Sequence, residues 1–540
     1  MIEKSLRKSR PQFQPPPEEE LPVIKIEDSR KLVDAGAGPS FFVKKIEIEG
    51  NTLFDDETLA PLVDIGEGLE MTLGVLSLYA GEVTAFYGQR GYILARAYIP
   101  EQEVKAGIVI LKVVEGKVGK IEVTGNEKLK REDFLKRMEA VMDEKVLKER
   151  TLERVLLELN DLMGVQVRSV LKPGELPGTS DLVLEVTETR PYQISVDADN
   201  FGSRFTGRNR FGFTGSVGNL FKLGDQFSFR AVRSDQGQNF FQPSYLIPIT
   251  SSGTVLKGSF TFSEHELGGS LSALKAGGST TIYNLEVTQP LVRSRNLQVF
   301  ARGGVEFRNF INKQFAQKTS DDKLRDFYVN LGGNYTDRFR GRTFFDLRTQ
   351  FGYTESDINR TLNSRSRGRG DVTVINLNLV RYQSTSPKFF NSYFVMRMDG
   401  QIASSRVLSP DQISIGGVGT VRGYPLAELS GDDGYDVSLE FVLPIPWKTP
   451  VGNRKLTLDR VMSLVAFIDH GKVFVLGRQP GEIDQTISGA GGGVRINVPK
   501  IKPNDVAVSF ALLYGIPVLG GPDPSDRSFG IFYLSGLMTY

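Results

Sequence analysis

The residues that most often perform chemistry are scarce in this chain. It contains no cysteine and only two histidines, His265 and His470, which lie far apart in the sequence. Disulfides, thiolate nucleophiles and cysteine-held metals are therefore excluded, and a zinc site or a Ser-His-Asp triad lacks its usual side chains. No other constellation of nucleophile, base or metal ligands is present in the pattern, so we expect no enzyme activity, no cofactor and no metal.

One cation stands in an unusual setting. Arg422 lies within GGVGTVRGYP, residues 416–425, where glycines surround a single arginine. Glycine adopts positive φ without penalty, so this backbone can turn tightly beside another surface. If the loop is held away from bulk water, the guanidinium needs a carboxylate to offset its desolvation. If the loop is an exposed turn, its ion pair is worth less than about 1 kcal/mol.

The bulk composition limits the classes of protein to which the chain can belong. With 540 residues it is long enough for several domains, and its net charge of +2 favours no nucleic acid or other polyanionic partner. No run of about 18 apolar residues predicts a membrane helix. The start, MIEKSLRKSR, is basic but has no apolar segment behind it. We expect that a signal peptide has been removed, the alternative being a protein that stays inside the cell.

Two copies of one small domain are expected before residue 190. VKKIEIEGNTLFDDETL begins at Val43, and the similar VGKIEVTGNEKLKREDF begins at Val118, 75 residues later. Each copy predicts a strand, a Gly-Asn turn, two helices and two further strands, an α+β arrangement. We expect an N-terminal segment with a proline-rich linker at 1–40, then domains at 41–116 and 117–189. A sheet of this kind can keep an open edge, which could pair with an extended peptide.

From residue 190 to residue 540 the pattern changes to short segments of alternating hydrophobicity. In DVAVSFALLYG, for example, Val508, Phe510 and Leu512 face one way. About sixteen such segments are present. Short links between them alternate with long ones, and the expected long links are 311–324, 354–370 and 404–433. This half predicts a transmembrane antiparallel β-barrel of about sixteen strands. A soluble sandwich or propeller is disfavoured because no repeat is found within this half.

Six motifs resemble a known family in their order along the chain. They are RGYILARAYIP (90–100), NDLMGVQVRSVLKPGELPGTSDLVLEV (160–186), LGDQFSF (223–229), SYLIPI (244–249), ISIGGVGTVRGYP (413–425) and LVAFIDHGKVF (464–474). The chain resembles the B-component (TpsB) transporters of two-partner secretion, the haemolysin and adhesin exporters of the POTRA–barrel superfamily. The family often carries a plug helix at its N-terminus. Here the segment before the first proline, residues 1–10, is short and basic. This departs from the family's pattern at the position where the plug helix would lie.

The resemblance implies a location and partners. The two small domains would be POTRA domains in the periplasm, and the barrel would lie in the bacterial outer membrane, in contact with lipid and lipopolysaccharide. The expected partner is a secreted exoprotein, an adhesin or haemolysin of the TpsA type, bound by the POTRA domains. It would pass unfolded through a monomeric barrel without ATP or a cofactor.

The resemblance also places the arginine. The VRGY motif would lie at the tip of loop 404–433, folded back into the barrel lumen, and the nearby FIDHG segment would point an acid at it. Period-two alternation puts Phe467 and Asp469 on one face of that segment, so Asp469 is the first candidate partner of Arg422 and Glu440 the second. We interpret this pair as a latch that holds the loop. The predicted latch residues are Val421, Arg422, Gly423, Tyr424, Glu440, Phe467, Asp469 and Gly471.

Four functions compete. Export of an exoprotein is favoured, because two POTRA domains suit it and insertases usually carry more. An outer-membrane insertase that assembles other barrels is the main alternative. A passive porin would leave the POTRA domains without a task, and an enzyme would lack its catalytic groups.

Two further motifs, one rich in glycine and one rich in arginine, carry weaker signals than the latch residues. GAGGGV (489–494) lacks the lysine and the strand–helix context of a phosphate loop, so small residues beside the loop tip are expected. SRSRGRG (364–370) predicts a solvated basic loop, with contact to lipopolysaccharide phosphates as the alternative.

Overall fold

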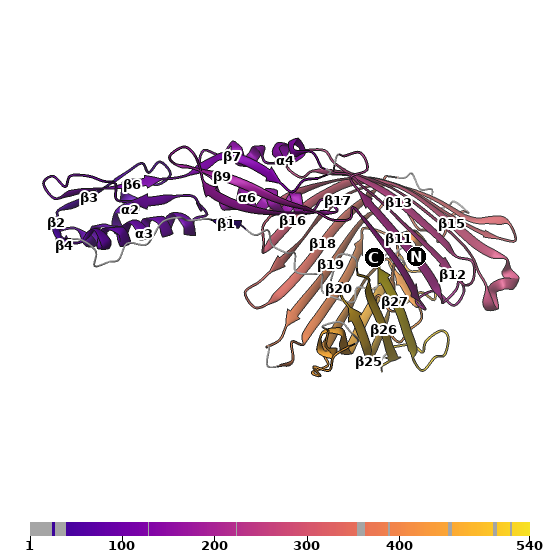
Figure 1. The fold of residues 1–540 in the computed structure, drawn as a ribbon. Helices are drawn as coiled ribbons and strands as arrows, with labels where there is room; N and C mark the ends of the chain where they lie inside the picture. Colours follow the sequence, from indigo (N-terminus) through magenta and orange to yellow (C-terminus); the bar gives the residue numbers. More distant parts are fainter. Residues whose placement is uncertain are drawn as a thin grey trace. The chain divides into compact units, whose positions relative to one another are not determined.

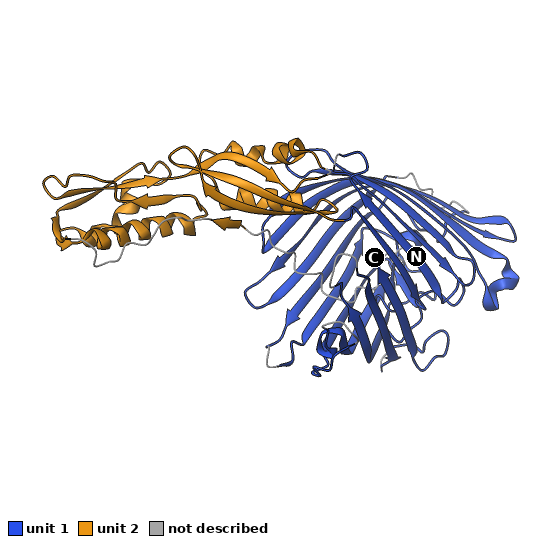
Figure 2. Ribbon diagram, viewed as in Figure 1, with its two compact units in different colours: residues 1–19, 190–540 blue, residues 20–189 orange. Residues whose placement is uncertain are grey.

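The computed structural model describes residues 24–26, 39–127, 129–222, 224–353, 362–386, 389–451, 456–500, 505–518 and 521–540. These residues fall into two compact units, one within residues 20–189 and one over Arg190–Tyr540 (Figure 2). The predicted N-terminal segment and linker, 1–40, lie almost wholly outside the described residues. Across the described ranges, none of the helices has the length and apolar character needed to cross a membrane.

The first small domain is an α+β sandwich of one sheet against helices (Figure 1). Its sheet has the order β3-β6-β5, with β3 parallel to β6 and β5 antiparallel to β6. Asp55 caps the first helix by accepting a hydrogen bond from the Thr58 amide at 2.9 Å. The elements are β2 (Phe41–Val43), β3 (Lys45–Glu49), α2 (Asp56–Leu59), η1 (Ala60–Leu62), η2 (Asp64–Gly66), β4 (Leu69–Met71), α3 (Leu73–Gln89), β5 (Arg96–Tyr98) and β6 (Ile108–Val114).

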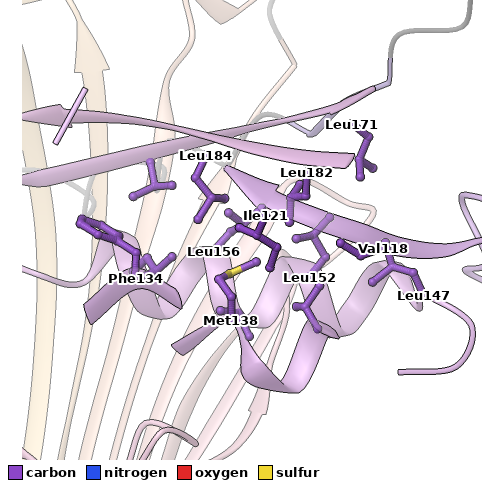
Figure 3. Packing of buried hydrophobic residues seen from close by; sticks show 14 of the residues in the cluster. Val118, Ile121, Phe134, Met138, Leu147, Leu152, Leu156, Leu171, Leu182 and Leu184 are labelled. Atoms are coloured by element: carbon purple, nitrogen blue, oxygen red, sulfur yellow. The ribbon is translucent and has the colours of Figure 1, made fainter. Parts of the chain in front are cut away.

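The second small domain repeats this plan. Its elements are β7 (Lys117–Thr124), α4 (Arg131–Arg137), α5 (Glu139–Met142), α6 (Glu149–Asn160), β8 (Val165–Pro173) and β9 (Thr179–Glu188). Leu152 and Leu156 of α6 pack against the sheet, close to Leu182 and Leu184 of β9 (Figure 3). A short strand from upstream, β1 (Ile24–Ile26), pairs in parallel with β8. The β8 edge of this sheet is therefore partly covered by the chain itself, and β7 is the outer strand on the other side.

The Gly-Asn turns of the two copies are built alike. Gly50 has φ +88°, and a Cβ there would lie 2.3 Å from the carbonyl oxygen of Val113; Gly125 has φ +78° and the same conflict with Val186 at 2.2 Å. The carboxylate of Glu115 accepts hydrogen bonds from the amides that follow the first turn. Only glycine fits these positions without strain, because the turn runs directly against the neighbouring strand.

The larger unit is a closed antiparallel barrel of 16 strands (Figure 1). Its strands are β10 (Tyr192–Asp199), β11 (Arg210–Gly218), β12 (Gln226–Ser234), β13 (Asn239–Pro248), β14 (Val255–Glu266), β15 (Ala276–Arg293), β16 (Leu297–Gln314), β17 (Gln317–Thr336), β18 (Gly341–Gly352), β19 (Thr373–Ser384), β20 (Tyr393–Ala403), β23 (Asp433–Pro444), β24 (Met462–Phe474), β25 (Gln485–Val498), β26 (Ala507–Pro517) and β27 (Ile531–Thr539). β27 closes the barrel by pairing with β10. The predicted architecture, two α+β domains followed by a 16-strand antiparallel barrel, is confirmed.

Alternation along the strands separates an apolar outer face from the inside of the barrel. On β24, Ile468 is 55% exposed, whereas its neighbours Phe467 and Asp469 are buried. On β26, Phe510 and Leu512 are exposed and Leu513 is buried. An exposed apolar face around a closed barrel, which has no unpaired edge, is the arrangement that lipid requires.

One expected long link is wrong. The sequence predicts a long link at 311–324, where the stretch NKQFAQKTSDDKL (312–324) is mostly polar. The structure extends β16 to Gln314 and begins β17 at Gln317, leaving a two-residue turn at Phe315 and Ala316, both with positive φ. A strand that continues beyond the apolar band needs no apolar face, so hydrophobic alternation cannot detect it.

Candidate functional site

The loop between β20 and β23 has a small core of its own. It contains a short helical turn, η5 (Ser409–Asp411), and a two-stranded ribbon of β21 (Ile413–Ile415) and β22 (Leu429–Gly431). Its apolar side chains pack with residues of β24 and β25 in one cluster: Ile413, Ile415, Val421, Tyr424, Leu429, Val473 and Ile487. The ribbon and this cluster hold the VRGY tip against one side of the barrel.

Arg422 is 2% exposed and is surrounded by acceptors. Its Nε and Nη2 donate to the two carboxylate oxygens of Asp469, each at 2.8 Å, and its Nη1 donates to Glu440 at 2.8 Å. Its Nη2 also donates to the hydroxyl of Ser438 at 3.0 Å. The guanidinium lies 3.5 Å from the centroid of the Phe467 ring. The structure thus brings together the cation and both predicted acids.

A second arginine completes the charge balance. Arg495 on β25 donates from Nη1 and Nη2 to the two oxygens of Glu440, at 2.5 and 3.0 Å. Burial alone would lower the pKa of Arg422, but Asp469 and Glu440 outweigh it and raise that pKa, so the guanidinium stays charged. Arg495 was missed at the sequence level. Its position two residues after Gly493 on the inward face was the available signal, since inward positions of barrel strands tolerate charge.

Glycines make room for the backbone of the loop tip. A Cβ at Gly489 would lie 1.8 Å from the carbonyl oxygen of Arg422. Gly423 has φ +98°, and a Cβ there would lie 2.5 Å from the backbone of Ile516. The prediction that small residues of GAGGGV lie beside the loop tip is confirmed. Of the loop's remaining glycines, Gly416 and Gly417 also have positive φ.

The other predicted latch residues are placed around the same point. A Cβ at Gly471 would lie 3.1 Å from a methyl of Val421, so the glycine provides space for that side chain. Tyr424 is buried, and its carbonyl oxygen accepts from the Tyr533 hydroxyl at 3.4 Å. That hydroxyl oxygen accepts in turn from the amide of Gly423 at 3.0 Å. The tip therefore contacts β24, β25 and β27 by backbone as well as by side chains.

A separate ion pair joins the long links to one another. Arg365 of the basic segment 364–370 donates to both carboxylate oxygens of Asp432, at 2.5 and 3.0 Å. Asp432 is fully buried and also accepts from the amides of Val407 and Leu476. The prediction of a solvated loop is therefore wrong for Arg365, whose guanidinium is bound by Asp432. The sequence pattern could not show this, because the two residues lie 67 positions apart.

A second ion pair between the long links, Arg406–Glu482, changes the pKa of its carboxyl group. Arg406 donates to both oxygens of Glu482 at 2.7 Å, and mainly this side-chain hydrogen bonding lowers the pKa of Glu482 to about 2.

Among the residues that the structure describes, no group of three or more His, Cys, Asp or Glu could hold a metal ion.

Comparison with known proteins gives two family matches. The family described as haemolysin secretion/activation protein ShlB/FhaC/HecB matches residues 178–496, more than half of the chain. The POTRA domain of the ShlB type matches residues 41–116.

Individual relatives agree with these matches. The heme/hemopexin transporter protein HuxB of Haemophilus influenzae is 26% identical over 76% of this chain and 73% of its own length. The outer membrane transporter CdiB of Escherichia coli O6:K15:H31 is 27% identical over 74% of this chain and 68% of its own.

Two solved structures share the fold. CdiB from Escherichia coli matches with a TM-score of 0.73 and 21% identity, covering 99% of this chain and 95% of that one. BamA from Haemophilus ducreyi lacking POTRA domains 1–3 matches with a TM-score of 0.54 and 14% identity, covering 93% of this chain and 100% of that one. At these identities the likeness concerns the fold alone.

Proposed function

Because the chain belongs to the haemolysin secretion/activation family (ShlB/FhaC/HecB), we propose that it exports one secreted protein across the bacterial outer membrane. Its POTRA domains, 41–116 and 117–189, receive an unfolded exoprotein in the periplasm. Its barrel, 190–540, conducts that exoprotein to the cell surface without ATP, and the barrel acts as a monomer. The observation that carries this proposal is a loop held by buried ion pairs inside a closed barrel with an apolar outer face.

The two rims of the barrel support an orientation. β10 begins at Tyr192 and β27 ends at Thr539, so these two strand ends lie at the same rim, which carries most of the short links, such as 294–296 and 337–340. Loop 404–433 emerges from the other rim. In outer-membrane barrels the short turns face the periplasm and the long loops face outward. The POTRA domains, joined at the short-link rim, would then lie in the periplasm.

The sheets of the POTRA domains supply candidate surfaces for an extended chain. β3 is an outer strand of the first sheet and β7 of the second. An unfolded polypeptide can add to such an edge through its main chain, with little demand on sequence. Both edges carry charged residues, but a register shift between Val118 and Ile121 interrupts the pairing of β7, whereas β3 pairs with β6 without a shift, so β7 is the less suitable edge. The first domain is therefore the better receptor.

The latch has a mechanical task in this scheme. Arg422 fixes the tip of loop 404–433 in one state, because breaking a buried ion pair on one side costs about 3–5 kcal/mol. Two conformations of a protein usually differ by only a few kcal/mol. Loss of Arg422 therefore shifts the loop away from this state, and transport depends on that state or on its controlled release.

The test is quantitative proteomics of the medium and outer membrane from a strain that lacks this gene. Export predicts that one large exoprotein disappears from the medium while the outer-membrane barrels remain constant. The alternative, an insertase, predicts that many barrels decrease together. The likeness to BamA does not favour that alternative, since it concerns the fold alone.

A further inference from the structure

A cavity separates loop 404–433 from one side of the barrel. It has a volume of about 300 Å³ and lies between residues 410–427 of the loop and inward side chains of β16, β18, β19 and β20. Glu306, Arg348 and Asn376 are among the side chains on the strand side, and Gly419 and Thr420 are among the residues on the loop side. The loop therefore does not fill the barrel evenly.

Another part of the barrel interior is packed with apolar groups, which reach onto β19 and β20 through Tyr382 and Val395. Val442, Val465, Phe467, Leu513 and Tyr533 form one buried cluster, against which Val418 of the loop also packs. Because dense apolar packing has few voids, an extended chain could enter there only by displacing several side chains at once. The cavity beside the loop offers space that already exists.

The polar wall carries charges of both signs that neutralise one another. Arg348 donates to Glu306 at 2.9 Å, and Arg302 donates to Asp346 at 3.0 Å. Side-chain exposure along β16 rises from 7% at Arg308 to 31% at Arg302, towards the short-link rim. Because the charges on this wall are paired with one another, the wall attracts neither cations nor anions strongly. Such a surface suits a polypeptide of mixed composition better than a single ion.

One ion pair closes this cavity at its more buried end. Asp411, at the end of η5, accepts from Nη1 and Nη2 of Arg308 at 2.7 and 3.2 Å, and Nε of Arg308 donates to Asp326 of β17 at 2.7 Å. Five strands of the barrel lie between β16 and β24, which holds Asp469. The loop is thus tied to two distant parts of the wall, through Asp411 and through Arg422, 11 residues apart.

We propose that the exported polypeptide passes between loop 404–433 and the β16–β20 wall, and that the Arg308–Asp411 ion pair is the contact that parts to admit it. Arg422 stays bound to Asp469 and Glu440 during this opening. The loop therefore rotates about its bound tip and does not leave the barrel. This inference rests on the proposed export function and assigns its path.

The first test is the ion conductance of the purified full-length chain in planar lipid bilayers in potassium chloride. Asp411→Asn keeps the size of the side chain but removes its charge, and we expect opening events to become roughly tenfold more frequent. Asp197→Asn is the matched control, because Asp197 is equally buried (5%) and accepts two hydrogen bonds from Arg230, but it joins two strands and not the loop. An unchanged opening frequency in Asp411→Asn, with a barrel that still shows the electrophoretic mobility shift on heating, overturns the inference.

The second test does not depend on how Asp411→Asn folds. Since the chain has no cysteine, single cysteines can be introduced at Asn376, on the cavity side, and at Ser535, buried on the inner face of β27. A charged methanethiosulfonate reagent should reduce the conductance of Asn376→Cys and leave Ser535→Cys unchanged. The reverse pattern, or equal effects at both positions, contradicts the path. Neither measurement involves the exoprotein, so failure here leaves the export proposal to the proteomic test.

Discussion

The carboxylate of Asp469 holds Arg422 by its backbone and by its side chain at once. One oxygen, Oδ2, accepts from the Arg422 amide at 3.0 Å and from its Nε at 2.8 Å, while Oδ1 accepts from Nη2. The contact therefore positions the loop backbone itself, and does more than neutralise a charge. A lysine could not reproduce it, because an ammonium lacks the planar fork that spans both oxygens.

Replacement of Arg422 tests the latch. Arg422→Ala leaves Asp469 and Glu440 buried with one cation fewer, and we expect secretion of the exoprotein to be lost while the barrel remains in the outer membrane. Arg422→Lys should restore only a small part of it. Secreted exoprotein and outer-membrane barrel are measured by immunoblotting of the two fractions. Arg208→Ala, which removes an exposed arginine paired with Asp526, serves as the control. Normal secretion by Arg422→Ala would end the latch hypothesis.

Glu440 and Arg495 should show strong coupling. Glu440→Gln leaves two buried guanidiniums with one carboxylate between them, so we expect it to lower the temperature at which the barrel unfolds on electrophoresis. Arg495→Gln alone should also be destabilising. The double variant should be less destabilised than the sum of the two, with a coupling of about 1–3 kcal/mol. Additive effects would show that the two side chains do not act as a pair.

Gly489 tests the seat of the loop tip without touching any charge. In Gly489→Ala the new methyl group would meet the carbonyl oxygen of Arg422 at 1.8 Å, so the tip must move away from β25. We expect secretion to fall as it does in Arg422→Ala, and loop residues to become more accessible to protease. Gly536→Ala is the control, because a Cβ there meets nothing within 4 Å. Wild-type secretion by Gly489→Ala would show that the tip need not be seated.

Glu115 predicts a pH dependence of the first small domain. Its burial raises the pKa, but hydrogen bonds from Thr52, Leu53 and Tyr87 outweigh this and lower it below the usual value of 4.5. Such a group stabilises the domain fully above its unfolded-state pKa, and this stabilisation is lost as the pH falls through the lowered folded-state pKa. Amide hydrogen exchange of residues 50–54 should therefore accelerate only below about pH 4.5.

A substitution checks the origin of this effect. Glu115→Gln should destabilise the domain at neutral pH by about 1–3 kcal/mol and flatten the acid dependence. Glu47→Gln, which alters an exposed pair with Lys45, should change neither. If the acid dependence persists in Glu115→Gln, another carboxyl group is responsible.

Local patterns in the sequence were enough to predict several features correctly. Period-two alternation put Phe467 and Asp469 on one face and Ile468 on the other, and the structure agrees because a strand has no other way to place its side chains. The repeat at Val43 and Val118 predicted two α+β domains. The order of the motifs predicted the family, which is confirmed by the match over residues 178–496. These features are encoded within a few residues of each other.

The remaining features were decided by contacts between distant parts of the chain. The extent of β16 and β17 was missed, because strand pairing beyond the apolar band leaves no hydrophobic signal. Arg495 and Glu440 are 55 residues apart, and Arg308 and Asp411 are 103 apart. Barrel closure places each pair at hydrogen-bonding distance.

The sequence by itself determined the elements, their order and the inward direction of the charged side chains, because these follow from periodicity and turn chemistry. The partners of Arg422 were expected from the family resemblance, but only the tertiary structure decided that Arg495 joins Glu440, that Arg308 joins Asp411, and where the loop leaves space. A buried charge takes whichever partner the closed wall brings within reach, and that choice depends on strand register around the whole barrel.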